Sequence, residues 1–599
     1  MCGIVGYIGD KNCSRILVDG LKELEYRGYD SAGIAILENG NIKVSKAIGK
    51  IKNLEEKVDF EQNSNFSIGI GHTRWATHGK PTELNAHPHL GEYSYVVHNG
   101  IIENYKELKE ELQNAGHKFV SQTDTEVIVH LFEFYFNQTN DAEQSFNSTI
   151  KRVEGAYSIL LITKSEPNKI FFMKHGSPLA IAKGEDKDEI FFASSDAPLI
   201  GHAQDVVYLE DGVSGIATKG DITFSQEVKW TTLPKSKQFA QKDGYRFFME
   251  KEIYEQSEVV IDAMMGRLTD DGIDFDEFDP NLIDGINEIK ICACGTSYHA
   301  GLSASYLFER LAKVRCTVEI ASEFRYKEPL LSKDTLFIVI SQSGETADTL
   351  EALKMAKDAG LKSLVVCNVD NSSMTRVADA TVLTRAGIEK GVASTKAFST
   401  QAVVLWMISL YFAKYKNTIS LDKLKSELHT LREVSSSLIV DDKIHEKCKR
   451  LSKRYLHGHG FFFIGRDIFY PLALEGALKL KEISYLHAEG YPAGEMKHGP
   501  IALADPELFT IALMPENLLY DKIKSNVEEL SARDSTICAI SPLDFELSDD
   551  FIKTKKSDHY MLEFFEMLVV VQLLSMEISI RLGNDVDMPR NLAKSVTVE

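Results

Sequence analysis

The sequence has no long uninterrupted apolar run and no cluster of basic residues. Its most apolar segment, residues 561–582, is broken by five charged or amide side chains: Glu563, Glu566, Gln572, Glu577 and Arg581. A membrane-spanning helix needs about 20 predominantly apolar residues, so this segment predicts a buried helix instead. The formal charge is −21, from 67 Lys and Arg against 88 Asp and Glu. This balance argues against a nucleic-acid binder, which needs clustered basic residues, but it leaves room for a small anionic substrate.

Three further absences narrow the class of protein. The charged and then apolar pattern of a secretory signal peptide does not open the chain. Eight cysteines in 599 residues form no repeating framework, which favours free thiols and predicts a cytoplasmic protein. Cys292 and Cys294 lack a second pair at zinc-binding spacing, and the Gly-x-x-x-x-Gly-Lys-Ser/Thr pattern of nucleotide P-loops does not occur. We therefore expect neither a cysteine-based metal site nor a P-loop.

Directly behind the initiator methionine stands Cys2, followed by an apolar, glycine-rich run. That run predicts a buried strand, which would hold this end of the chain in place. If Met1 is removed, Cys2 carries a thiol and a free α-amine, whose ordinary pKa of about 7.7–8.0 allows proton exchange near neutrality. Such a residue is a nucleophile with its own base. The simpler alternative is a small buried cysteine, because free cysteine is commonly buried.

The length predicts three or four domains. Up to about residue 235, short strands with two or three helices predict an α+β layered domain. Apolar spacing predicts a helix over 14–25, and Asn104 is expected to cap a helix that ends near Gly116. Polar clusters follow the predicted strands at 27–31, 72–79, 85–89 and 98–100. Their five histidines suggest a metal site, but no two have helical spacing with a Glu between them, so we expect no metal.

Six segments of this region occur in a fixed order. They are 2–6 (CGIVG), 25–33 (EYRGYDSAG), 72–79 (HTRWATHG), 85–89 (NAHPH), 98–105 (HNGIIENY) and 123–126 (TDTE). Together they resemble the glutaminase domain of the N-terminal-nucleophile amidotransferases, from residue 2 to about residue 230. The resemblance implies that the Cys2 thiolate attacks the carboxamide of glutamine and releases ammonia, and that water then clears the glutamyl thioester.

The same resemblance assigns roles to residues around Cys2. Asn99 and the backbone N–H of Gly100 would form the oxyanion hole, in which one donor is typically worth about 10²–10³ in rate. The residues that would bind glutamine are Arg74, Thr77, His87 and Asp124, and Trp75 would be a gate for ammonia. The Arg74 guanidinium suits the α-carboxylate and Asp124 the α-amine. Taken singly, Arg74 could be a solvated ion-pair partner and Trp75 a core aromatic.

A polar stretch at 236–246 predicts a linker, and a helix-rich segment follows it. From residue 289 strands alternate with helices, which predicts an open parallel α/β sheet. Loops rich in small hydroxyl residues are expected at three strand ends: 294–297 (CGTS), 341–346 (SQSGET) and 393–395 (AST). Their N–H groups and hydroxyls can cradle an anion at a helix N-terminus, although a serine-rich cap is the simpler reading of any single loop.

The layout then recurs, because a strand at 460–464 leads through Gly465 and Arg466 into a helix over 470–483. This predicts an internal duplication of two α/β halves. The second half lacks the serine-rich loops, which suggests one binding site and not two. We expect a glutaminase domain at 2–235, the linker at 236–246, two α/β domains at 247–420 and 421–588, and a C-terminal tail at 589–599.

Residues 289–599 resemble tandem sugar-isomerase domains, of which the loop at 341–346 is a specific sign. The whole chain resembles the isomerising glutamine:fructose-6-phosphate amidotransferases, which implies conversion of glutamine and fructose 6-phosphate to glucosamine 6-phosphate and glutamate. It also implies that one set of residues binds the sugar phosphate: Thr296, Ser297, Ser341, Gln342, Ser343, Thr346 and Ser394. A related enzyme for another sugar phosphate and a sugar-phosphate-sensing regulator are the alternatives.

Glu475, Lys479 and Glu482 stand at i, i+4 and i+7, on one face of a predicted helix. They could form an exposed salt-bridge stripe. By resemblance, Glu482 is instead the base that moves a proton between C1 and C2, with Lys479 beside it. His498 would open the sugar ring from a neighbouring subunit, which implies at least a dimer, and Lys594 would form a Schiff base with the ketose. The resemblance implies no metal, no organic cofactor, no nucleic acid and no membrane.

Overall fold

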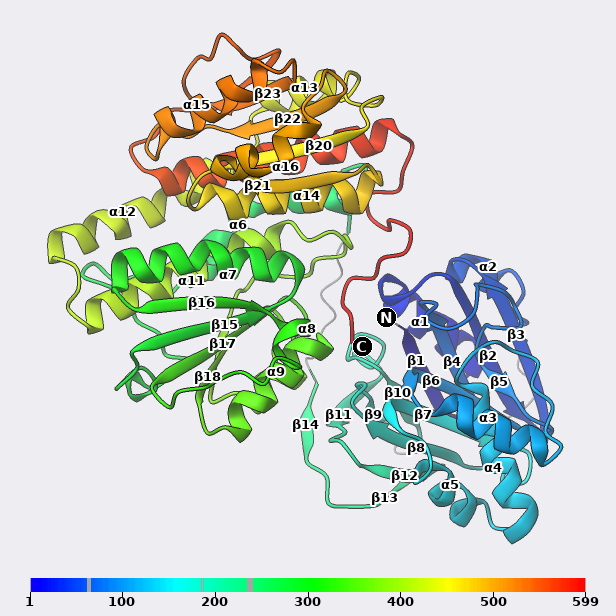
Figure 1. Cartoon of the computed structure of the whole chain (residues 1–599). Helices are drawn as coiled ribbons and strands as arrows, with labels where there is room; N and C mark the ends of the chain where they lie inside the picture. Colours follow the sequence, from blue (N-terminus) through cyan, green and yellow to red (C-terminus); the bar gives the residue numbers. More distant parts are fainter. Residues whose placement is uncertain (1, 62–65, 185, 187, 234–240, 598–599) are drawn as a thin grey trace. The chain divides into compact units, whose positions relative to one another are not determined.

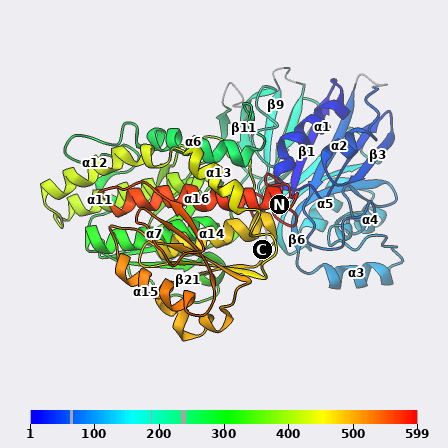
Figure 2. The same cartoon turned by 90° about the horizontal axis from the view of Figure 1, so that it is seen from above.

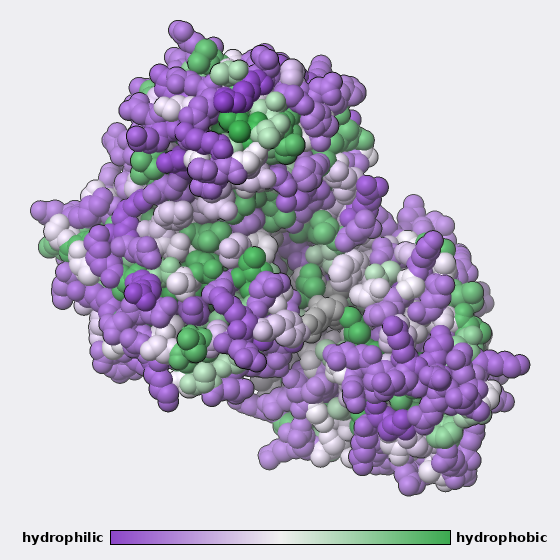
Figure 3. All heavy atoms as spheres, in the orientation of Figure 1, coloured by the Kyte–Doolittle hydropathy of each residue, from purple (hydrophilic) through white to green (hydrophobic). Residues whose placement is uncertain are grey.

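The structure is a computed structural model that describes residues 2–61, 66–184, 186, 188–233 and 241–597. The chain divides into two compact units, one made of residues up to 239 with 593–599 and the other of residues 240–592 (Figure 1). Of the predicted linker, residues 236–240 lie outside the described part, and 241–246 form neither helix nor strand. Every helix in the described ranges is too short or too polar to cross a membrane. Polar side chains cover most of the face seen in Figure 3.

The first unit contains two antiparallel sheets. The larger has the order β14 (Trp230–Thr232), β11 (Ala203–Tyr208), β9 (Ala180–Gly184), β10 (Ile190–Ala193), β1 (Gly3–Gly9), β4 (Ser67–Arg74), β2 (Ser31–Glu38) and β3 (Asn41–Ile48). The smaller has the order β13 (Asp221–Phe224), β12 (Ser214–Thr218), β8 (Ile170–His175), β7 (Gly155–Thr163), β6 (Ser94–Ile102) and β5 (His89–Leu90). The predicted α+β layered domain is confirmed.

Alternation along the strands explains the layers. In β1, Val5 and Tyr7 pack against α1 (Cys13–Leu24) and α2 (Ile51–Glu55), whereas Ile4 and Ile8 face the smaller sheet. The outer face of the smaller sheet packs against α3 (Tyr105–Asn114), α4 (Glu126–Thr139) and α5 (Ala142–Ile150). The unit is thus a four-layer α/β/β/α sandwich, visible from above in Figure 2.

Asn104 does stand at the N-cap position of α3, but its side chain does not cap the helix. The amide donates instead to the carbonyl of Arg152 at 2.8 Å and accepts from the N–H of Glu154 at 3.2 Å. Asn104 therefore ties the start of α3 to the turn before β7.

The second unit contains two five-stranded parallel sheets. The first has the order β16 (Arg315–Ile320), β15 (Glu288–Ala293), β17 (Thr335–Ser341), β18 (Lys362–Cys367) and β19 (Ala380–Leu383). The second has the order β21 (Ala488–Pro492), β20 (Gly460–Gly465), β22 (Leu508–Leu513), β23 (Thr536–Ser541) and β24 (Asp550–Lys553). Both follow the order 2-1-3-4-5 within their half, so the structure confirms the duplication.

A shared layer of helices separates the two sheets. Its main members are α6 (Phe248–Met264), α7 (Gly295–Leu307), α11 (Lys396–Tyr415), α14 (Phe469–Ser484) and α16 (Tyr560–Arg581), with α12 (Leu421–Ser437) and α13 (Asp442–Leu451) at its edge (Figure 1). Inward residues of both sheets, such as Ile291 and Phe463, join one continuous apolar core with these helices. The outer faces pack against α8 (Ala321–Phe324), α9 (Ala347–Asp358) and α10 (Ser373–Val377) in the first half and α15 (Tyr520–Ser531) in the second.

This topology positions the predicted anion loops. In a 2-1-3-4-5 sheet the strand order reverses between the first and third strands, and ligands bind there at the carboxyl ends. Residues 294–297 follow β15 and residues 341–346 end and follow β17, so both loops lie at that point. The prediction for the third loop, 393–395, was wrong in one respect. Ser394 does not follow a strand, since β19 ends at Leu383, but it lies two residues before α11.

Candidate active sites

The first candidate site is built around Cys2, which lies directly before β1. The antiparallel pairing of Gly3 with Thr73 places Cys2 beside the end of β4. The N–H of Trp75 donates to Cys2 Sγ at 3.4 Å, and Sγ lies 3.5 Å from the carbonyl of Trp75. Burial raises the pKa of the Cys2 thiol, while the Trp75 N–H and the Arg74 guanidinium oppose that shift. The half-buried thiol thus has nearby groups that favour its ionised form.

The predicted oxyanion residues come from β6, in the other sheet. Asn99 Nδ2 donates to the carbonyl of Cys2 at 3.3 Å, and Asn99 Oδ1 has no hydrogen-bond partner among the described residues. Gly100 has φ +128°, and a Cβ added there would overlap the carbonyl of Ala156 on β7. Only glycine fits at this position, where the backbones of β6 and β7 come close together.

Arg74 and Asp124 are both buried, and each keeps polar capacity for a ligand. Arg74 Nη2 donates to the carbonyls of His78 and Gly79, the latter at 3.1 Å, whereas Nη1 has no partner among the described residues. Asp124 accepts from the N–H of Ile102 at 2.8 Å through Oδ2. Burial lowers the pKa of Arg74, but a guanidinium remains charged at any physiological pH. A free carboxylate and a free amine could therefore bind to these two residues.

The other predicted residues of this site have different surroundings. Thr77 is exposed and Trp75 is half-buried. His87 is buried, stacks on His72 with ring centroids 3.9 Å apart, and contacts Thr125 Oγ1 at 3.0 Å. His98 contacts the same hydroxyl at 2.9 Å. Burial lowers the pKa of His72 to about 3 and lowers that of His87 well below its ordinary value, so these imidazoles are neutral.

Three residues that received no role from the sequence support this site. Asp30 Oδ2 accepts from the N–H of Ala76 at 2.8 Å and so holds the turn that follows Arg74. Thr125 joins two of the histidines. Glu126 accepts from the N–H groups of Val120 and Ser121, at 2.8 and 2.7 Å, and so holds the loop that carries Asp124. Asp30, Thr125 and Glu126 all lie inside the matched segments, which was the only signal for them.

The second candidate site begins at the loop between β17 and α9. Ser341 Oγ accepts from the N–H of Gly344 at 3.0 Å and lies 3.2 Å from Thr346 Oγ1. Ser343 Oγ accepts from the N–H of Glu345 at 3.2 Å. Gly344 has φ +68°, and a Cβ there would overlap the hydroxyl of Ser372. The loop is a compact set of rotatable hydroxyls and backbone N–H groups, the chemistry that binds a phosphate.

The start of α7 connects this loop region to the second half of the unit. Thr296 Oγ1 donates to Glu475 Oε1 at 2.9 Å, and His299 Nδ1 lies 2.7 Å from Glu475 Oε2. Ser297 Oγ accepts from Gln401 Nε2 on α11 at 3.0 Å. Residues of α7 and α14 therefore form one polar cluster, although they belong to different halves.

Lys479 is the centre of that cluster. It is fully buried, and its Nζ lies 2.6 Å from Glu482 Oε2, 3.4 Å from Glu475 Oε1 and 3.2 Å from Thr296 Oγ1. Burial alone would lower the pKa of Lys479, but the two carboxylates outweigh it and the net pKa is raised. An exposed salt-bridge stripe is thus excluded. Glu475 is also fully buried, whereas the Glu482 side chain is 20% exposed and is the carboxylate that a ligand could reach.

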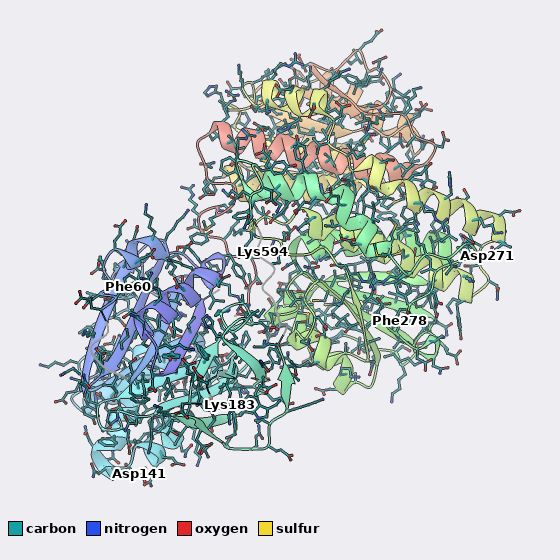
Figure 4. All side chains as sticks on the ribbon, turned by 180° about the vertical axis from the view of Figure 1, so that it is seen from behind. Phe60, Asp141, Lys183, Asp271, Phe278 and Lys594 are labelled. Carbon is teal, nitrogen blue, oxygen red and sulfur yellow. The ribbon has the colours of Figure 1, made fainter. Side chains whose placement is uncertain are left out.

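The remaining predicted residues are placed as follows. Gln342 and Ser394 are half-buried, and His498 is exposed at the end of the 3₁₀ helix η4 (Ala493–His498). Lys594, labelled in Figure 4, is half-buried in the tail segment that belongs to the first unit. The roles predicted for these four residues stay predictions.

Glu389 is a further residue that the sequence did not suggest. Its buried Oε1 accepts from the N–H groups of Thr395 and Ala397 at 2.9 and 3.0 Å. It thereby caps α11 and fixes the loop that carries Ser394.

Family models agree with this division of the chain. A glutamine amidotransferase domain matches residues 73–200, and an SIS domain matches twice, at residues 283–411 and 458–574. The fold and the two sites therefore define a two-part enzyme that joins an N-terminal-nucleophile glutaminase to tandem sugar-isomerase domains.

Full-length relatives make the assignment specific. The chain is 61% identical to the glutamine–fructose-6-phosphate aminotransferase (isomerizing) of Campylobacter jejuni and 52% identical to that of Helicobacter pylori, with 100% of each chain covered in both cases. The C-terminal domain of the glucosamine–fructose-6-phosphate aminotransferase of Francisella tularensis is 41% identical, with a TM-score of 0.56 over 59% of this chain and 100% of that one. The chain belongs to the family of isomerising glutamine–fructose-6-phosphate aminotransferases.

Proposed function

We propose that this chain converts glutamine and fructose 6-phosphate to glutamate and glucosamine 6-phosphate. The observation that carries the proposal is the buried Lys479, held between Glu475 and Glu482 and bonded to Thr296 beside the phosphate-type loops. A lysine and a reachable carboxylate next to an anion cradle suit proton transfer on a phosphorylated sugar. The names of the full-length relatives specify the two substrates.

In the first unit, the Cys2 thiolate attacks the glutamine carboxamide, ammonia leaves, and water hydrolyses the glutamyl thioester to glutamate. Asn99 and the Gly100 N–H stabilise the oxyanion that forms at each step. Arg74 Nη1 binds the α-carboxylate and Asp124 the α-amine, with Thr77 and His87 as further members of this pocket. Trp75, whose backbone contacts Sγ, gates the passage of ammonia.

In the second unit, ammonia replaces the C2 oxygen of fructose 6-phosphate and a proton moves from C1 to C2, so that one water is released. Glu482 carries that proton, and Lys479 neutralises the carboxylate when it is ionised. The phosphate and hydroxyls bind to seven residues: Thr296, Ser297, Ser341, Gln342, Ser343, Thr346 and Ser394. Lys594 forms the Schiff base with the ketose, and His498 opens the ring.

The organisation of the enzyme is part of the proposal. The domains are 2–235, 247–420 and 421–588, with a tail at 589–599. His498 is exposed in the single chain, which agrees with its serving the site of a neighbouring subunit in a homodimer or larger assembly. All eight cysteines are free thiols, which supports a reducing, cytoplasmic location.

One assay tests the proposal. Purified protein receives glutamine and fructose 6-phosphate together and singly, and glutamate, glucose 6-phosphate and glucosamine 6-phosphate are followed. We expect glucosamine 6-phosphate only with both substrates. Cys2→Ala should abolish glutamate release while fructose 6-phosphate is still isomerised to glucose 6-phosphate, and Cys13→Ala, at a buried cysteine of the same unit, should retain both activities. Glutamate release at the normal rate from Cys2→Ala would refute the nucleophile, and no amino sugar from the wild type would refute the reaction.

A further inference from the structure

The two halves of the isomerase unit differ at equivalent loops. Because both sheets have the order 2-1-3-4-5, the loop after the third strand lies at the switch point in each half. This loop follows β17 in the first half and β22 in the second. The third and fourth residues after the strand end are Gly344 and Glu345 in the first half and Glu516 and Asn517 in the second.

In the first half, the two N–H groups bond to hydroxyls of their own loop. Gly344 donates to Ser341 Oγ at 3.0 Å and Glu345 donates to Ser343 Oγ at 3.2 Å. A hydroxyl has one proton that rotates and two acceptor positions, so each can also bond to an incoming oxygen. The loop stays open to a ligand without losing its internal support.

In the second half, the two N–H groups bond to a single carboxylate from α16. Glu516 donates to Glu563 Oε1 at 2.7 Å and Asn517 donates to Glu563 Oε2 at 3.1 Å. The Glu563 side chain is fully buried. Its two oxygens each take one N–H beside the start of α15, the arrangement by which a loop before a helix holds an oxyanion.

The difference has a simple origin in the sequence. α11 and α16 are the last helices of their halves, and the fourth residue is Ser399 in α11 and Glu563 in α16. The Ser399 hydroxyl turns back on its own helix and donates to the carbonyl of Lys396 at 3.0 Å. The longer Glu563 side chain instead reaches the loop. The two halves thus differ both in the hydroxyls of the loop itself and in the side chain at this helix position.

We propose that Glu563 is a built-in anion that occupies the second half's counterpart of the phosphate loop, so that sugar phosphate binds in the first half alone. This inference rests on the proposed function, which assigns sugar-phosphate binding to the first half. It explains why a duplicated fold carries one substrate site for each chain, since an anion that entered the second loop would have to displace a buried carboxylate that is already bonded there.

The first test is the binding stoichiometry of the wild-type chain, measured by isothermal titration calorimetry with fructose 6-phosphate. One sugar phosphate for each chain supports the inference, and two would overturn it. Absence of any binding would refute the proposed function itself, and the variant experiment then decides the role of Glu563 separately.

The second test replaces Glu563 by the residue type of the first half. Glu563→Ser should lower the thermal midpoint, and inorganic phosphate should then raise that midpoint by at least about twice the shift seen in the wild type, because a second anion now binds the folded state. Glu566→Ser is the matched control, since it removes a buried carboxylate one turn further along α16 that bonds to Lys555 and not to this loop. It should show only the wild-type response to phosphate.

A third variant separates anion binding from general loss of packing. Glu563→Gln keeps the side chain in place without its charge, so we expect a lower midpoint and only the wild-type phosphate response. A phosphate response in Glu563→Ser no larger than that of Glu566→Ser would overturn the inference. If Glu563→Ser does not fold, an enlarged phosphate response in Glu563→Gln would overturn it, and the wild-type stoichiometry still decides.

Discussion

The two halves of the isomerase unit share a strand order, a layer of helices and one core, yet they differ in the few residues that reach the end of their third strands. In the first half these are hydroxyls and a glycine in a left-handed conformation. In the second half the corresponding loop bonds to Glu563. The comparison shows that two halves with one strand order can differ in the chemistry of equivalent loops, with hydroxyls in the first and an internal carboxylate in the second.

The second half nevertheless contributes residues to the candidate site. Its helix α14 supplies Glu475, Lys479 and Glu482, and Thr296 and His299 of the first half contact Glu475. In the proposed site the two halves therefore contribute different parts, with the hydroxyl-rich loop in the first and the ionisable groups in the second. The predictions below test which residues each half contributes to the proposed site.

The largest expected effect concerns Glu482, the residue of the second half that we propose as the base. Glu482→Gln should reduce isomerisation of fructose 6-phosphate by about 10²–10⁴-fold, the usual contribution of a general acid–base group, because an amide cannot take the proton. The rate of conversion of fructose 6-phosphate to glucose 6-phosphate measures this loss, and glutamine hydrolysis by the first unit should persist. Glu489→Gln, at a half-buried glutamate on β21, is the control. An unchanged rate in Glu482→Gln would remove this residue from the mechanism.

The next prediction makes the first half resemble the second. Ser399→Glu introduces at the fourth position of α11 the side chain that α16 carries, and it should compete with the phosphate for the loop. We expect the KM for fructose 6-phosphate to rise by at least about 10-fold, from the roughly 1.5–3 kcal/mol of one charged hydrogen bond. Steady-state kinetics measure it. Ser399→Ala should leave KM close to the wild-type value, and an equal KM in all three proteins would break the comparison.

A third prediction concerns the glycine that the open loop requires. Gly344→Ala should destabilise the protein by about 1–3 kcal/mol, because its backbone is left-handed and the new Cβ overlaps Ser372. The KM for fructose 6-phosphate should rise with the loss of loop geometry. Gly360→Ala is the control in the same half, where φ is +74° but the space is open except for the end of Lys333. Denaturant unfolding and kinetics together measure both effects, and similar results for the two variants would contradict the steric argument.

The smallest expected effect is a pH dependence of stability that arises from a carboxyl group of the second half. The seventh residue is Ala402 in α11 and Glu566 in α16, where burial raises the pKa of the Glu566 carboxyl to about 7. The folded state then holds a proton that the unfolded state releases above about pH 4.5. The resulting stability, of order 1–3 kcal/mol, is present below pH 4.5 and lost as the pH rises to about 7.

Glu566→Gln should remove that pH dependence and stabilise the protein above pH 7. Urea unfolding between pH 5 and 8.5 measures the change. Glu528→Gln, at a half-buried glutamate on α15, should keep the wild-type slope. A wild-type slope in Glu566→Gln would assign the dependence to another group.

Much of the isomerase unit could be predicted from the sequence, because buried parallel strands and amphipathic helices have clear patterns. The predicted strand at 460–464 is one residue shorter than β20, and the predicted helix at 470–483 is one residue shorter than α14 at each end. In the first unit, α4 received no prediction, although Glu126, His130 and Glu133 stand at helical spacing; its first eight residues are all buried. β3 was missed for the opposite reason, because it is a mostly exposed strand at the sheet edge.

The candidate sites were predictable to the extent that their residues lie in matched segments. The spacing of Glu475, Lys479 and Glu482 indicated a shared helix face but could not show that two of them are fully buried. Glu389 and Glu563 gave no signal, because each acts on backbone N–H groups outside its own segment. Glu389 lies just before the predicted loop at 393–395, and Glu563 is 47 residues from Glu516. Such contacts depend on how helices pack across the unit, which no local pattern encodes.

The helical layer between the two sheets has a consequence for folding. Residues of both halves form one apolar core with α11, α14 and α16, so neither half can expose its inner face without unfolding the other. In hydrogen-exchange terms, the central amides of these three helices should open together, only through the global transition, while α9 and α15 on the outer faces open earlier. Although the sequence repeats, the unit is then a single cooperative foldon.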